Sequence, residues 1–423
     1  MGRHSVVCNE FVSWAKAYEG EKFHAVLCDP PYGLEFMGQE WDAPYKSRWQ
    51  DSQTPDKTGR GSWFGGGTPS SQKRVQYEAS APYQQWTTEW AKALIPLLHP
   101  GALCFVFGGT RTWHRLACGL EDAGFQVWDT LMWLHGQGFP KAQDVGQMVE
   151  KKLTLGVARR PDRDRGGLTR NRWSGSEEGT LISDTGGDVP LTTDSGKSWS
   201  GHKTAALKPA WEPIICAKAP MQGKTYAELA LQHGSGALNV DGGRIGGVAG
   251  RPSSPANPLD RYPANLALGC TCRDATQYAG KPIRHTDPNC PAFMLDEQAG
   301  KHRARFFYCA KASRSEREAG CEKLETVTRH RVNPGGLENE PRWAPTQVKN
   351  DHPTVKPLGL CRWLATLLLP PDSVKPRRLL VPFCGSGSEM IGALQAGWDE
   401  IVGVEQDAHY CDIARARMTG MGR

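Results

Sequence analysis

The sequence lacks any apolar run long enough to cross a membrane, because no segment approaches 18 consecutive apolar residues. The stretch from Met1 to Asn9 also lacks the long apolar core of a secretory signal. The thirteen cysteines are odd in number and scattered through apolar contexts, as expected of a reduced protein. Together these features predict a cytoplasmic protein with no membrane partner.

The net charge is only +6 over 423 residues, yet its distribution is uneven. Residues 141–350 hold 31 lysines and arginines against 23 acidic residues, whereas the rest of the chain holds 20 against 22. Positive charge in the middle of the chain predicts a surface that binds a polyanion. The length predicts a catalytic domain with a sizeable insert or a second domain.

One stretch, Asp29-Pro30-Pro31-Tyr32, predicts chemistry; we call it the proline corner. It follows the apolar run 24–28, which is short enough to be a buried strand. Two prolines cannot continue a sheet ladder, so the chain leaves the strand as a stiff, extended turn. The turn presents a carboxylate, a free carbonyl and an aromatic face, which suit a flat substrate with an amino group. A proline-rich turn without function is the alternative.

Strand and helix patterns alternate at both ends of the chain, which predicts an α/β sheet with parallel pairing. In the first part we expect strands at 6–10, 24–28, 102–107 and 125–134, helices at 11–18, 84–98 and 112–123, and a long loop at 33–85. Residues 136–206 show no pattern, 211–218 read as a strand, and 219–350 are rich in loops. In the last part we expect helices at 358–369 and 389–396, strands at 378–383 and 400–404, and only a helix after Asp407.

The strand at 378–383 runs into Phe383-Cys384-Gly385-Ser386-Gly387-Ser388, which we call the glycine loop. Glu405 lies twenty residues beyond Gly385, at the end of the next strand. A glycine turn below a ligand and an acid at the next strand end are typical of an α/β sheet that binds an adenosine. No lysine follows the second glycine, so the phosphate-loop pattern is absent.

Together these residues resemble the amino-group DNA methyltransferases, specifically the permuted subgroup called the β class. In that family an Asp-Pro-Pro-Tyr motif precedes a Phe-x-Gly-x-Gly cofactor loop, and the recognition region lies between them. Here the proline corner comes first and the glycine loop last, and His352-Pro353-Thr354-Val355-Lys356-Pro357 matches the segment that members carry before the loop. The resemblance covers residues 1–135, 207–218 and 351–415, about half the chain.

The resemblance implies a Rossmann-like methyltransferase sheet with circularly permuted motif order and a large, loop-rich DNA-recognition insert. The implied parts are a catalytic half (1–135), a basic insert (136–206), a return strand (207–218), a target-recognition region (219–350) and a cofactor-binding half (351–423). Such a sheet needs a strand beyond the Glu405 strand, and the permutation implies that it is the first one, Ser5–Asn9. One departure is Val381, where members commonly carry an aspartate.

The family implies S-adenosylmethionine as methyl donor and double-stranded DNA as substrate, with the target base swung out of the helix. The Asp29 carboxylate and the Pro30 carbonyl would accept the two amine hydrogens, without a covalent enzyme intermediate. The implied catalytic residues are Asp29, Pro30, Pro31 and Tyr32. The implied cofactor-binding residues, from both ends of the chain, are Asn9, Asp29, Lys356, Pro357, Phe383, Gly385, Ser386, Gly387, Ser388 and Glu405.

The middle region interleaves basic and aromatic residues, and we expect DNA contacts from Arg159, Arg160, Arg170, Arg172, Arg303 and Arg305. A solvated loop is the alternative. Cys270, Cys272, His285 and Cys290 suggest zinc by residue type, but a second short cysteine pair is missing, so we expect structural thiols or a loop scaffold and no metal.

Three functions stay open. Adenine-N6 methylation is favoured, because family members that act on cytosine more often begin the tetrapeptide with serine. Cytosine-N4 methylation on the same scaffold is the second. The third is a DNA-binding regulator that has lost turnover, against which the intact corner and loop argue. No nuclease motif is present, so a restriction partner would be a separate protein. A homodimer also stays open.

Overall fold

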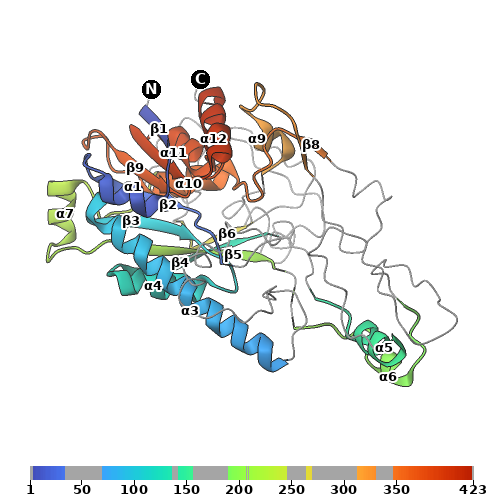
Figure 1. Ribbon diagram of the computed structural model, residues 1–423. Helices are drawn as coiled ribbons and strands as arrows, with labels where there is room; N and C mark the ends of the chain where they lie inside the picture. The colour runs from blue at the N-terminus through green and yellow to red at the C-terminus, as the bar shows by residue number, and fades with distance from the viewer. Residues whose placement is uncertain are drawn as a thin grey trace, which may run out of the picture.

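The computed structural model describes residues 3–33, 69–135, 142–155, 189–205, 207, 209–244, 263–268, 312–329 and 346–421, with backbone alone at 69–80, 155, 268 and 329. Among them, a large sheet lies between two layers of helices (Figure 1). No helix in these ranges is long and apolar enough to span a membrane.

The large sheet has the strand order β1-β10-β9-β2-β3-β5-β4-β6. Its strands are β1 (Arg3–Cys8), β2 (Phe23–Cys28), β3 (Leu98–Phe107), β4 (Gln126–Leu134), β5 (Trp211–Lys218), β6 (Leu266–Leu268), β9 (Arg378–Pro382) and β10 (Glu400–Glu405). The strands from β1 to β3 in this order are parallel, β5 runs antiparallel to both β3 and β4, and β4 and β6 are parallel. The predicted α/β sheet is confirmed, and its pairing is parallel except at β5.

Helices cover both faces of the sheet and build two cores. On one face lie α1 (Phe11–Ala17), α3 (Pro69–Leu94), the 3-10 helix η3 (Ile95–Leu97) and α4 (Trp113–Ala123). On the other lie α10 (Leu358–Leu368), α11 (Ser388–Ala396) and α12 (Ala408–Met421). The strand β2 between them is fully buried, as its unbroken apolar run requires.

The first strand closes the sheet beyond the strand of Glu405. β1 pairs in parallel with β10, with Val6 opposite Gly403 and Cys8 opposite Glu405. The prediction that the missing strand is the first one is therefore confirmed. As a result, the two ends of the chain lie close together in Figure 1.

The prediction of a loop over 33–85 is wrong from Pro69 onward, because α3 begins there. The helix continues through Pro82, which lies before the predicted helix start at 84, although proline removes one helical hydrogen bond. Close packing of α3 on α4 compensates for the hydrogen bond that Pro82 removes. At this contact a Cβ on Gly119 of α4 would lie 2.6 Å from the Thr87 side chain of α3. Similarly, Pro100-Gly101 does not precede β3 but lies inside it, at a register shift where Gly101 has φ +71°.

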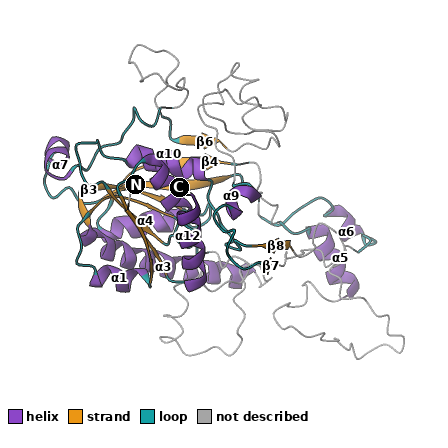
Figure 2. Cartoon of the chain, turned by 90° about the horizontal axis from the view of Figure 1, so that it is seen from above, coloured by secondary structure: helices purple, strands orange, loops and turns teal. Residues whose placement is uncertain are grey.

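The middle of the chain contains elements that its composition did not predict. Inside 136–206 lie α5 (Val145–Leu155) and α6 (Asp194–Ser198), apart from the sheet in Figure 2. The buried Glu150 joins them, since its carboxylate accepts hydrogen bonds from the Thr193 hydroxyl (2.6 Å) and the Thr192 amide (2.9 Å). The loop-rich region 219–350 contains α7 (Tyr226–His233), β6, α9 (Arg314–Glu318), β7 (Val327–Arg329) and β8 (Thr346–Val348); β7 and β8 form a second, small sheet.

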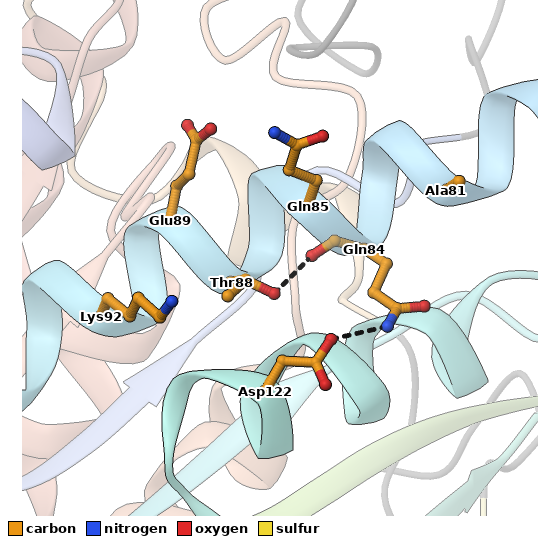
Figure 3. A pocket seen from close by; sticks show the side chains of 7 residues that line it. All are labelled: Ala81, Gln84, Gln85, Thr88, Glu89, Lys92 and Asp122. Carbon is orange, nitrogen blue, oxygen red and sulfur yellow. Dashed lines mark hydrogen bonds between the residues drawn. The ribbon is translucent and has the colours of Figure 1, made fainter.

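A shallow groove of about 470 Å³ lies between α3 and α4 (Figure 3). Its lining residues are Ala81, Gln84, Gln85, Thr88, Glu89, Lys92 and Asp122. The Gln84 amide donates to Asp122 at 2.7 Å across its floor. None of these residues belongs to the proline corner or the glycine loop, so the groove is separate from the site described next.

Candidate active site

The proline corner lies at the carboxyl end of β2. Side chains from two other segments hold it by donating hydrogen bonds to its backbone carbonyls. The Tyr83 hydroxyl on α3 donates to the Pro31 carbonyl at 2.9 Å, and the Thr112 hydroxyl donates to the Tyr32 carbonyl at 2.7 Å. Gly109, just after β3, packs on the Tyr32 ring, where a Cβ would lie 3.1 Å from a ring carbon. The corner is thus fixed from α3 and from the segment between β3 and α4.

The ammonium of Lys356 donates to Asp29 Oδ2 in the buried part of the corner. Lys356 is 4% exposed, and its Nζ lies 4.9 Å from the centre of the Phe107 ring and 5.3 Å from that of Tyr32. The other carboxylate oxygen, Asp29 Oδ1, is buried and has no hydrogen-bond partner among the described residues. A buried acceptor without a partner is unfavourable by roughly 1–3 kcal/mol, so this oxygen is suited to receive a donor from a ligand.

Glu212, which no sequence motif indicated, joins this cluster from β5. Its Oε2 accepts from the Tyr32 hydroxyl at 3.1 Å and lies 3.7 Å from Lys356 Nζ. Its Oε1 lies 3.3 Å from His135 Nε2, just after β4. Its place follows from strand direction: β5 runs antiparallel to β3, so an acid at the start of β5 lies at the edge where the parallel strands end, and the sequence alone did not indicate that direction.

The charges in this cluster shift each other's pKa values. Burial raises the pKa of Asp29, and the Lys356 ammonium opposes that shift. Although burial lowers the pKa of Lys356, the carboxylates of Asp29 and Glu212 raise it overall. Lys356 is therefore a fixed positive charge and no proton acceptor. Burial together with these two carboxylates raises the pKa of the Tyr32 hydroxyl well above its usual range, which keeps it a hydrogen-bond donor.

The glycine loop follows β9, next to the proline corner, because β9 and β2 pair in parallel. Gly385 has φ +47° and Gly387 φ +78°, conformations that favour glycine. The Glu405 carboxylate, at the end of β10, accepts from the Gly385 amide at 3.0 Å and from the Asp407 amide at 2.9 Å. The predicted pairing of glycine turn and acid is thus present as a direct contact.

Two neighbours of the loop take positions that the motif did not reveal. The His352 ring lies against Gly385, where a Cβ would be 2.6 Å from Nε2. Arg417 of α12 is fully buried and donates to the Ser386 carbonyl at 2.7 Å and to the Ser388 hydroxyl at 3.2 Å. The segment 352–357 therefore contacts both the glycine loop, through His352, and the proline corner, through Lys356.

The remaining residues of the predicted cofactor set surround this edge. Phe383 has φ +55°, and its ring lies 5.5 Å from that of Phe11 and 5.6 Å from that of Trp86, inside an aromatic cluster of the core. The exposed Asn9 donates its backbone amide to the Glu405 carbonyl at 2.9 Å. Pro357 is the residue before α10.

Glu389 of α11 is another buried acid that the sequence did not single out. It is 4% exposed, and burial together with the Asp29 charge raises its pKa to about 7, against the effect of Lys356. This carboxyl therefore titrates near neutral pH beside the loop and the corner.

Several predicted residues lie outside the described part of the chain. These are the proposed DNA contacts Arg159, Arg160, Arg170, Arg172, Arg303 and Arg305, and the zinc candidates Cys270, Cys272, His285 and Cys290. Within the described ranges, no group of three or more histidine, cysteine, aspartate or glutamate residues could hold a metal ion.

Solved structures similar to this chain include DNA methyltransferases. The M1.HpyAVI–SAM complex has a TM-score of 0.36 and 13% identity, covering 98% of each chain. The cytosine-N4-specific PvuII DNA methyltransferase has a TM-score of 0.41 and 11% identity, covering 99% of this chain and 86% of the other. The sequence has no match among curated proteins.

The family model described as DNA methylase, of the N6/N4 type, matches residues 23–416. Because that match spans most of the sequence, from β2 to α12, the chain belongs to the DNA methylase family.

Proposed function

We propose that this member of the DNA methylase family transfers a methyl group from S-adenosylmethionine to the N6 amine of a flipped adenine in double-stranded DNA. The observation that carries the proposal is Asp29 Oδ1, a buried acceptor without a partner in the described structure, beside an adenosine-type glycine loop. The Tyr32 ring would stack on the flipped base.

The residues present fit S-adenosylmethionine. The Glu405 carboxylate is oriented by two backbone amides, and each oxygen keeps a lone pair for a ribose hydroxyl. The glycine loop would hold the rest of the cofactor, with Arg417 supporting the loop through Ser386. When bound, this cofactor supplies a methyl group on a positively charged sulfur, and the carbon–sulfur bond breaks with its electron pair left on sulfur as the target nitrogen bonds to carbon.

The chain's own contribution is orientation and charge. Asp29 Oδ1 accepts a hydrogen of the target amine and directs the nitrogen lone pair, while Oδ2 is held by Lys356. The negative carboxylate stabilises the positive charge that the nitrogen gains, and one nitrogen proton then passes to solvent water. No cysteine is needed as a nucleophile.

Adenine is preferred over cytosine-N4 as the target because the tetrapeptide begins with Asp29 rather than serine. The β-class motif order, with the recognition region at 219–350 and a basic insert at 136–206, belongs to the same proposal. It rests on the order of the proline corner and the glycine loop along the chain.

The test is to incubate the protein with unmethylated genomic DNA and labelled S-adenosylmethionine, and to identify the methylated nucleoside by mass spectrometry. The proposal predicts N6-methyldeoxyadenosine, at a fixed sequence that modification-sensitive sequencing would give. N4-methyldeoxycytidine would overturn the choice of base. Cofactor binding without transfer to any DNA would favour the non-catalytic regulator.

A further inference from the structure

The cluster of Glu212, Lys356 and Tyr32 has a chemical arrangement that stability alone does not explain. Two carboxylates, on Asp29 and Glu212, share the single ammonium of Lys356. Replacing a buried ion pair by apolar residues is often neutral or stabilising, so such clusters are weak evidence of a contribution to the fold. Glu212 keeps 21% of its side chain exposed, so the cluster is not sealed from solvent.

We propose that Glu212 is a positioning residue for methyl transfer: it holds the Tyr32 hydroxyl and the Lys356 ammonium so that Asp29 presents Oδ1 to the target amine. This inference rests on the proposed function and adds to it a residue that lies outside the proline corner, the segment 352–357 and the glycine loop.

The geometry gives Glu212 two separate tasks. First, its Oε2 accepts from the Tyr32 hydroxyl at 3.1 Å, which anchors the end of the side chain on whose ring the flipped base would stack. Second, the same oxygen lies 3.7 Å from Lys356 Nζ. It therefore draws the ammonium partly towards β5, so that Lys356 binds only Oδ2 of Asp29 and Oδ1 stays open.

Glu212 also sets the charge of the site. Together with Asp29 it places two carboxylates around the one ammonium of Lys356. A negative site favours an amine that becomes cationic as it is methylated. The Glu212 charge also raises the pKa of Asp29, whose other charged or titratable neighbours are Lys356, Tyr32, the buried Cys28 thiol of β2 and, on α11, Glu389.

The test uses the full-length protein with Glu212→Gln and Glu212→Ala, and Glu121→Gln on the exposed surface of α4 as a matched control. Single-turnover methyl transfer to unmethylated genomic DNA is measured from pH 5 to 9, together with cofactor affinity and melting temperature. Glu212→Ala should slow transfer by roughly 100-fold, the scale of a displacement of about 1 Å in a reacting geometry, with cofactor affinity unchanged.

Glu212→Gln should be intermediate, because the amide oxygen still accepts from Tyr32 but the charge is absent. The acid limb of its pH–rate profile, where the rate falls as Asp29 becomes protonated, should move to lower pH. The reason is that removing the Glu212 charge lowers the pKa of Asp29. A merely structural role would not move this limb.

Wild-type rates and an unmoved acid limb in both Glu212 variants would overturn the inference, provided that the wild type transfers methyl groups and Asp29→Ala does not. A wild type that transfers no methyl group would instead overturn the proposed function. One further outcome would also contradict the positioning role. In it, Glu212→Ala is slow but shows no melting transition, so that it is unfolded, and Glu212→Gln keeps the wild-type pH profile.

Discussion

At the scale of residues, the motifs predicted which groups meet but not how they are held. Asp29, Gly385 and Glu405 could be predicted, because strand–turn patterns place them at one edge of a parallel sheet. Glu212 and Arg417 could not, because their roles depend on strand direction and helix packing that only the tertiary structure supplies. Lys356 was predicted to bind the cofactor, which stays a prediction; in the structure its ammonium binds the Asp29 carboxylate.

Glu405→Ala should weaken S-adenosylmethionine binding by roughly ten- to hundredfold, because hydrogen bonds to a charged acceptor are worth about 1.5–3 kcal/mol. Glu405→Gln should weaken it less, since one acceptor remains for the Gly385 amide. Titration calorimetry measures the affinity, and the melting temperature shows whether the fold is kept. An unchanged affinity in Glu405→Ala would mean that this acid does not bind the ribose.

At the scale of elements, the alternation of strands and helices was predictable, while the first part of the long helix α3, before Gln84, was not. Its sequence contains Pro82 and is preceded by a glycine-rich stretch, so local propensity opposed what packing against α4 achieves. The start of β3 at Leu98 was not predictable either, because Pro100-Gly101 indicated a turn but is tolerated inside the strand at a register shift. In the middle region α5 depends on the long-range hydrogen bonds of Glu150 with Thr192 and Thr193, which composition does not reveal.

Three histidines from different elements lie in a row: His24 of β2, His99 of β3 and His233 of α7, with ring centres 4.6 Å and 5.5 Å apart. Burial lowers the pKa of His24 to about 4, with a further contribution from Arg378, and burial also lowers the pKa of His99 to about 4. Unfolded histidine titrates near 6.5. Protonation therefore favours the unfolded chain, and this part of the stability is complete above about pH 6.5 and disappears as the pH falls towards 4.

We therefore expect the urea midpoint to fall between pH 7 and pH 5. His24→Asn should reduce that fall, since its side-chain oxygen can accept the Arg378 amide that His24 Nδ1 accepts at 3.1 Å, without titrating. Urea unfolding at the two pH values, followed by circular dichroism, measures it. An equal fall in the variant would show that His24 does not contribute to this dependence.

At the scale of the whole molecule, the chain divides its charge as its proposed tasks require. The proline corner, with the Asp29 carboxylate, and the glycine loop lie at the carboxyl ends of sheet strands. The excess of positive charge lies in residues 141–350. Because the proposed DNA-binding arginines lie outside the described residues, their role stays a prediction from sequence. The joint replacement Arg170→Ala with Arg172→Ala should weaken DNA binding and flatten its salt dependence, by roughly one unit of log–log slope for each phosphate that is no longer neutralised.

The matched control for that pair is Lys16→Ala with Lys92→Ala, two exposed lysines on helices that cover the sheet. It should leave the salt dependence unchanged. Fluorescence anisotropy over a salt series gives the slopes. If replacing the two arginines leaves the slope at its wild-type value, they belong to a loop that does not bind DNA.

Whether Asp29 orients the target amine is tested most directly by single-turnover methyl transfer with Asp29 variants. Asp29→Ala should abolish transfer while folding, cofactor binding and DNA binding persist, because the missing interaction matters mainly in the transition state. Asp29→Asn should keep partial activity, since its amide oxygen accepts a hydrogen bond without charge. A near-zero rate for Asp29→Asn would indicate a general base instead. A wild-type rate for Asp29→Ala would contradict the proposed role of the proline corner as a whole.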